Sequence, residues 1–225
     1  MIICQNCGHE GENNYCSICG QVLQAKRISL PHLIHEVIHT FTHFERGYLF
    51  TLRELLFRPG IMQRKYLSGL RLHYQKPFPM FTISGTLCAL ALYLLYKNAP
   101  VLTDQYFKNY YFLVQAVLLP VYALITYLLF YSRKLYYAEA LVLNIYMVGF
   151  MLLLILPINC FAFFLSTESI SLIELIVLTI YNVWTYVNFF NDKPTWWIIV
   201  KSIVSILACY LLFQEVSILV MKWFM

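Results

Sequence analysis

The chain has 225 residues, of which 60% are hydrophobic, 17% aromatic and only 12% charged. Soluble domains carry about 25% charged residues, so this composition excludes a soluble globular enzyme for most of the chain. The net charge of +5 does not indicate nucleic-acid binding, because the basic residues cluster beside apolar runs, where they set membrane topology and meet anionic lipid headgroups. We therefore predict an all-α polytopic membrane protein.

The N-terminal segment carries a repeated cysteine motif. Cys4 with Cys7 and Cys16 with Cys19 form two CxxC pairs, and a glycine follows each pair. Two residues between cysteines allow a tight knuckle whose sulfurs face one ion, and the glycine tolerates the positive φ that such a turn needs. Two knuckles predict a closed tetrahedral Cys4 site for structural Zn2+, with iron as the alternative metal. The doubled motif disfavours a redox CxxC pair.

An amphipathic helix is predicted over residues 29–46, with Ser29 as its N-cap and Gly47 at its end. At about 100° per residue, apolar side chains occupy one face and polar side chains the other. The polar face contains His32, His35, Glu36, His39, His43 and Arg46. We expect this helix to lie in the membrane interface or to pack on the transmembrane bundle.

The same segment contains His35-Glu36-Val37-Ile38-His39, which matches HExxH. In zinc hydrolases of this type the two His bind the metal and the Glu activates a metal-bound water. A third ligand is not evident, and Glu139 and Glu174 are the candidates near the membrane. Three interpretations stay open. We favour a polar stripe that faces solvent or headgroups over a non-catalytic metal-binding or proton-sensing face and over a membrane zinc hydrolase.

Residues 47–77, which we call the basic collar, are predicted to form two short helices. The spacing of Thr51 and Glu54 predicts a capping box that starts a helix through Leu56, and the Arg-Pro-Gly of residues 58–60 breaks it. A second helix over residues 61–68 ends at glycine. Six cations are spread through the collar: Arg53, Arg58, Arg64, Lys65, Arg71 and Lys76. Beside membrane spans, such a run is typical of a headgroup-binding segment.

The order of motifs in residues 4–85 resembles the bacterial domain-of-unknown-function family 3667 (DUF3667), known mainly from Bacteroidetes genomes. These motifs are CxNCG, YCxxCGQ, FTHFExGxxFTLxxLLxRPG and YLxGxRxxYxxPF. The resemblance implies the four N-terminal cysteines as zinc ligands and assigns no reaction. It also implies a set of signature positions: Arg58, Pro59, Gly60, Tyr66, Gly69, Arg71 and Pro77. Leu70 stands where the family has Lys, and Ala140 replaces the His of a family Glu-His pair, so no role of those groups is carried over.

Five apolar runs are long enough to cross a bilayer. They cover residues 78–96, 112–131, 141–165, 172–190 and 196–213. Leaving out Lys201, which lies inside the last span, twelve Lys and Arg fall on the same side of the membrane as the N-terminus and three on the other side. This asymmetry predicts a cytoplasmic N-terminus. We therefore expect a multi-pass protein of the bacterial inner membrane. Its predicted parts are a zinc ribbon (1–24), a juxtamembrane helical region (25–77) and a transmembrane bundle (78–225).

Three ionisable residues in or beside the spans need an explanation, because a charge at mid-bilayer costs at least about 2.5 kcal/mol. We interpret Glu139 and Lys201 as snorkelling near the cytoplasmic ends, and Glu174 as lying near the outer end. A small transporter that uses one of the glutamates is an alternative. The predicted function is a binding module, in which ribbon and collar bind a cytoplasmic protein or anionic headgroups.

Overall fold

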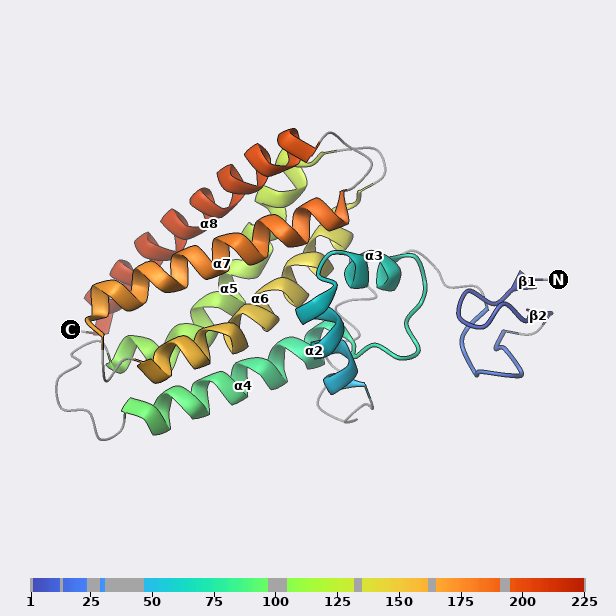
Figure 1. Cartoon of the computed structure of the whole chain (residues 1–225), viewed down its shortest axis with the longest axis horizontal. Coiled ribbons are helices and arrows are strands. Elements are labelled where there is room, and N and C mark those ends of the chain that lie inside the picture. Colours follow the sequence, from blue (N-terminus) through green and yellow to red (C-terminus); the bar gives the residue numbers. More distant parts are fainter. Residues whose placement is uncertain are drawn as a thin grey trace.

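The structure is a computed structural model. It describes residues 2–12, 14–23, 29–30, 47–96, 105–131, 135–161, 165–190 and 195–224. Within these ranges the chain is mainly helical, and a two-stranded antiparallel sheet lies near the N-terminus, formed by β1 (Ile2–Ile3) and β2 (Glu10–Gly11). The strands and the C-terminal end of the chain lie at opposite ends of the molecule (Figure 1).

Five helices are long and apolar enough to cross a membrane. They are α4 (Pro77–Tyr96), α5 (Gln105–Leu129), α6 (Tyr137–Cys160), α7 (Thr167–Phe189) and α8 (Thr195–Phe224). The predicted all-α polytopic class and the predicted number of spans are thereby confirmed. The last helix runs beyond the predicted end at residue 213; in this added part, Gln214 Nε2 donates to Tyr210 Oη one turn earlier at 2.8 Å.

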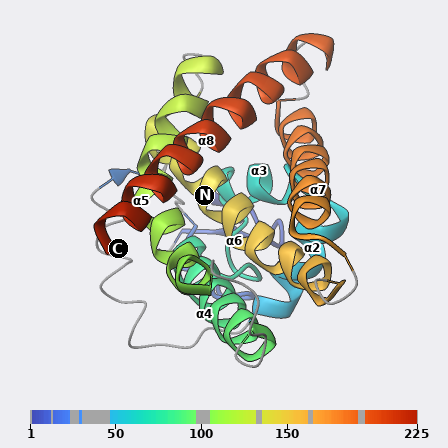
Figure 2. The same ribbon diagram turned by 90° about the vertical axis from the view of Figure 1, so that its left-hand side faces the viewer.

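Helix α6 is the centre of the bundle. It contacts α4, α5 and α7, and most of its residues from Ala138 to Phe150 are buried. Figure 2, which views the bundle from one end, shows α6 in the middle with α4, α5, α7 and α8 around it. A helix that is apolar on every side belongs in such a position, because no face of it is suited to water.

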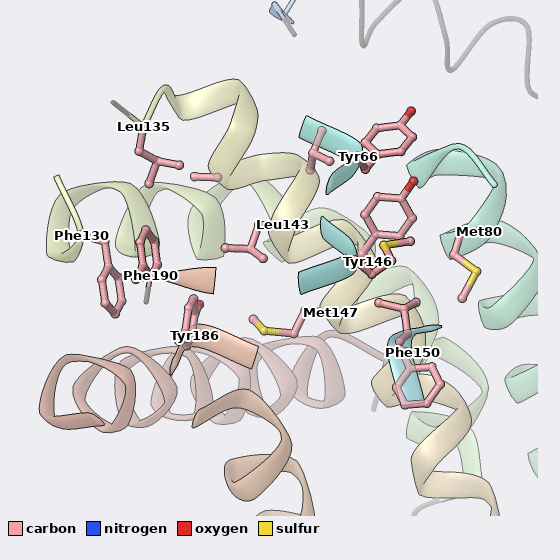
Figure 3. Packing of buried hydrophobic residues seen from close by; sticks show 14 of the residues in the cluster. Tyr66, Met80, Phe130, Leu135, Leu143, Tyr146, Met147, Phe150, Tyr186 and Phe190 are labelled. Carbon is pink, nitrogen blue, oxygen red and sulfur yellow. The ribbon is translucent and has the colours of Figure 1, made fainter. Parts of the chain in front are cut away.

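Two short helices, α2 (Tyr48–Phe57) and α3 (Ile61–Leu67), pack on the end of the bundle nearest the strands (Figure 1). Both contact α6, and α3 also contacts α7. Leu55 of α2 and Met62 of α3 are fully buried in the same apolar cluster as Tyr146 of α6. Figure 3 shows Tyr66 of α3 beside Tyr146, with ring centroids 5.4 Å apart. The collar is therefore part of the bundle core.

The first collar helix differs from the prediction at the residue where it begins. Helix α2 begins after Gly47, whose φ is 126°, so the capping box predicted at Thr51 is wrong. Thr51 is fully buried inside the helix, and its Oγ1 accepts a hydrogen bond from Gln75 N at 2.7 Å. The predicted second helix is confirmed within one residue, and Gly69 follows it with a φ of 113°.

Candidate metal centre and its collar

The two CxxC pairs have the same backbone conformation. Cys4 N donates to His9 O, and Cys16 N donates to Gln21 O, both at 2.8 Å. The glycine after each pair has a positive φ, 74° in the first and 73° in the second. The sheet joins the ends of the first turn, and a bridge between Tyr15 and Val22 closes the second. The repeated motif has therefore folded as two equivalent knuckles.

The four thiol groups converge on one point. The sulfurs of Cys4, Cys7, Cys16 and Cys19 all lie within 4.8 Å of one another and could bind a metal ion. The Sγ atoms of Cys4 and Cys19 are 3.6 Å apart, and those of Cys7 and Cys16 are 3.5 Å apart. Sulfurs about 2.3 Å from one tetrahedral ion are about 3.8 Å from each other. The donor set fits a closed four-thiolate site that joins one knuckle to the other.

The environment of the four thiols is electrostatically uneven. A backbone hydrogen bond from Gln21 lowers the pKa of Cys19 to about 6, against the opposing effect of burial. A backbone hydrogen bond at His9 lowers the pKa of Cys7, but burial and the neighbouring thiols outweigh it and raise that pKa to about 12. Four thiolates this close repel one another, and a bound cation would offset that repulsion.

The ribbon is hydrogen-bonded to the collar. Gln21 directly follows the second knuckle, only 6% of its surface is exposed, and its Nε2 donates to Gly69 O at 2.7 Å. Gly69 N in turn donates to Tyr66 O at 3.2 Å. This contact joins the second cysteine knuckle to the end of α3 across 48 residues of sequence. It also gives Gly69, a predicted signature position, a structural role.

The Arg-Pro-Gly turn lays the backbone of the collar directly on α7. Gly60 has a φ of 79°, and a Cβ atom there would collide with Thr185 O and lie 2.7 Å from Phe189 N. Gly60 N donates to Gln63 Oε1 at 2.5 Å, which starts α3. Pro59 is buried beside it. The turn therefore has a packing role, because a larger residue than glycine cannot approach α7 so closely.

Two further signature residues join α3 to the loop that follows it. Arg71 Nε donates to Tyr66 O at 3.2 Å, and its guanidinium carbon lies 5.5 Å from the centre of the Tyr66 ring. The Tyr66 ring also forms a T-shaped pair with Tyr146. Arg71 is thus part of the collar's internal packing as well as of its positive charge.

The predicted histidine face lies outside the described residues. It consists of His32, His35, Glu36, His39, His43 and Arg46. The amphipathic helix over residues 29–46 and the HExxH match therefore stay predictions.

The ionisable residues at the membrane ends of α6 and α8 have structural partners. Glu139 is only 7% exposed, and its Oε2 accepts from Tyr136 N at 2.9 Å, so it caps the first turn of α6. Lys201 Nζ donates to Leu129 O, the last residue of α5, at 2.5 Å. Its Nζ also lies 5.3 Å from the centre of the Trp197 ring. Each of the two side chains thus bonds to a helix end, and the snorkelling predicted for Glu139 and Lys201 stays a prediction.

The third ionisable residue, Glu174, makes a hydrogen bond between two spans. Its Oε1 accepts from Asn159 Nδ2 at 2.5 Å, and the same Nδ2 donates to Ile155 O at 2.9 Å. Glu174 is half-buried on α7, whereas Asn159 is buried near the end of α6. This pairing links two helices in the way that polar residues commonly do in membrane bundles.

Sequence reasoning missed the polar groups that attach the collar to the spans. Tyr146 Oη donates to Gln75 O at 2.5 Å, and Tyr181 Oη donates to Leu55 O at 3.3 Å. Tyr48 Oη pairs with Ser84 Oγ at 3.1 Å. A signal was present, because tyrosines in the middle of a span need a hydrogen-bond partner there, unlike tyrosines in interfacial belts. Their partners could not be read from the sequence.

The fold and the cluster together define a polytopic helical protein with a four-cysteine N-terminal module. Residues 45–88 match the family described as protein of unknown function (DUF3667). The matched segment covers α2, α3 and the first half of α4, and the predicted resemblance to this family is confirmed there. None of the curated proteins and none of the solved structures compared with the chain matches it.

Proposed function

We propose that this protein is a multi-pass protein of the bacterial inner membrane whose zinc ribbon is a binding module for a cytoplasmic protein, and that it is not an enzyme. The observation that carries the proposal is the hydrogen bond from Gln21 Nε2 to Gly69 O. Through it, a closed four-thiolate site is attached to a collar that is itself packed into the bundle. Such an arrangement presents a surface and leaves no open metal position for substrate.

Zinc is the metal we assign to Cys4, Cys7, Cys16 and Cys19. Four thiolates at tetrahedral spacing suit this ion, and structural sites of this kind are closed. Among the described residues of the ribbon, the buried apolar cluster contains only the two ligands Cys4 and Cys16 together with Leu23. With so little buried apolar area, the ion would supply most of the folding free energy of the ribbon, on the order of 10 kcal/mol.

The cytoplasmic side is inferred from charge. Leaving out Lys201 inside the last span, twelve Lys and Arg fall on the side of the membrane that carries the ribbon and three on the other side. Reporter fusions after residues 108, 134, 168, 193 and 225 test this topology, and we expect them to alternate outside, inside, outside, inside and outside. A cytoplasmic C-terminus would contradict it.

The ribbon surface favours a protein as the partner of this module. Its exposed side chains include four large apolar ones: Ile3, Tyr15, Ile18 and Val22. Residues 1–23 contain two Glu and no Lys or Arg, so the ribbon has no cations with which to neutralise nucleic-acid phosphates. Exposed apolar residues on so small a unit are typical of a protein interaction site. We therefore expect a partner with an apolar patch and a neutral or basic rim.

In-cell photo-crosslinking tests the proposal. A photoreactive residue in place of Ile18, 69% of whose surface is exposed, should give a defined protein adduct. The adduct should disappear in the same chain carrying Cys4→Ser and Cys19→Ser, provided that the membrane level of the protein is unchanged. A matched control places the same residue at Leu90 on α4, which should give no adduct with that partner. An Ile18 adduct that persists without the cysteines would refute a metal-dependent module.

A further inference from the structure

Helix α2 has two apolar faces, and one of them is largely exposed; within it, Phe50 also packs against the rings of His73 and Tyr74, with centroids 6.4 and 5.5 Å apart. Its outer face consists of Leu49, Phe50, Arg53, Leu56 and Phe57, all of which are exposed. At about 100° per residue these positions fall within an arc of roughly 120°. Leu49 is 78% exposed and Phe57 is 64% exposed, whereas Thr51 and Leu55 on the opposite face are completely buried. The outer face is therefore an apolar stripe with one cation at its centre.

The contacts of α2 place it at the depth of the spans. Tyr48, its first residue, pairs with Ser84, which lies about two turns, or ~10 Å, inside the start of α4. Leu55 accepts a hydrogen bond from Tyr181, which lies ~12 Å before the end of α7. Figure 1 shows α2 lying across the spans instead of parallel to them. The outer face is thus beside the apolar surface of the bundle, at the membrane boundary.

The charges around α2 have one dominant sign. Arg53 is exposed within the stripe, and the side chain of Arg58, just after the helix, is 60% exposed. Glu54 is the one acid of the collar; it lies 4.0 Å from Arg58, and its side chain is only 14% exposed. Long arginine side chains keep their charge at the surface while their stems lie along apolar groups. The ligand of this face must therefore combine apolar chains with negative charge.

We propose that the outer face of α2 and Arg58 bind the anionic surface of the lipid bilayer. The apolar side chains enter the boundary of the acyl chains, and the two guanidinium groups bind headgroup phosphates, as in interfacial amphipathic helices. This deepens the proposed function and rests on it for the membrane location. A membrane is the occupant because the face combines exposed apolar side chains with two exposed arginines, and because Tyr48 of the same helix pairs with Ser84 of α4, a helix long and apolar enough to cross a membrane.

Photo-crosslinking in nanodiscs tests the placement. The full chain is reconstituted in equal parts of phosphatidylglycerol and phosphatidylcholine, with a photoreactive residue in place of Leu49. We expect lipid adducts, detected by mass spectrometry, as from the positive control at Leu90, and none from the same residue at Ile18. Adducts to protein, or within this chain, instead of lipid would overturn the inference. Lipid adducts at Leu90 without any at Leu49 would also overturn it while leaving the membrane location intact. Failure at both positions would refute the proposed function as well.

The charge requirement is tested in the same nanodiscs. Adducts at position 49 should favour phosphatidylglycerol, and Arg53→Gln should reduce this preference about fivefold. Lys65→Gln, which removes one positive charge from the neighbouring α3, is the matched control and should leave the preference unchanged. Equal labelling of both lipids, or an equal drop in the phosphatidylglycerol preference in the two variants, would show that Arg53 does not bind the headgroup charge.

Discussion

The ribbon and the collar are hydrogen-bonded to each other, but different interactions stabilise the fold of each. In the described part of the ribbon, the buried apolar cluster is three residues, two of which are cysteine ligands of the candidate metal site. The collar shares a large apolar cluster with α6 and α7 and is bonded to them by buried tyrosines. A unit without an apolar core depends on its ion, whereas a unit with one depends on packing. We therefore expect the ribbon and the collar to unfold independently of each other.

The largest expected effect is loss of the metal. Cys4→Ser with Cys19→Ser should remove one zinc per chain and unfold the ribbon, since the ion would contribute on the order of 10 kcal/mol there. Elemental analysis and protease cleavage within residues 2–23 measure the change. The thermal unfolding of the bundle should stay as in the parent chain, and zinc retained by the variant would rule out this site.

A second substitution tests the packing of the collar on α7. Gly60→Ala forces a residue with a Cβ into a φ of 79° and against the backbone of α7. We therefore expect the free energy of unfolding of the bundle to fall by about 3 kcal/mol. Gly8→Ala is the matched control, because Gly8 has a φ of 74° but nothing within 4 Å of the added atom. Gly8→Ala should lower the stability of the ribbon by about 1 kcal/mol and leave the bundle unchanged. Equal effects on thermal unfolding of the bundle would contradict the close approach of collar and α7.

A smaller effect is expected at the hydrogen bond between α6 and the collar loop. Tyr146→Phe leaves the buried carbonyl of Gln75 without its hydroxyl donor, at a cost of about 1–2 kcal/mol. Tyr131→Phe is the control, because that side chain is 64% exposed. Unfolding in detergent measures both. An equal decrease in the free energy of unfolding in the two variants would contradict a stabilising hydrogen bond from Tyr146 to Gln75.

The smallest effect is expected at the HExxH match. Glu36→Gln keeps the size of the side chain and removes a general base. If the histidine face is a polar stripe, this variant should have normal zinc content, normal membrane levels and an unchanged cellular phenotype. Loss of the phenotype with normal levels and full zinc content would instead make the protein a zinc hydrolase at His35, Glu36 and His39.

Local chemistry was sufficient to predict the ribbon and the spans. Cys4 and Cys7 have a spacing that fixes a knuckle within four residues, and a bilayer requires about twenty apolar residues in succession. Both signals lie in short stretches of sequence, so no knowledge of the rest of the fold was needed. The same holds for α3, which a glycine ends locally.

Contacts between distant residues were settled by the tertiary structure. Thr51 has the spacing of a helix cap, yet its hydroxyl accepts a hydrogen bond from Gln75 N. Glu139 is buried at the start of α6, where it accepts from Tyr136 N, and the sequence did not predict this partner. Residues 49–57 are mainly apolar, with Arg53 and Glu54 as the two charged residues, and only the burial of Thr51 and Leu55 identified the exposed face. The physical reason is that a hydrogen bond or a buried face depends on which residues meet in space, and a one-dimensional pattern does not specify the partner.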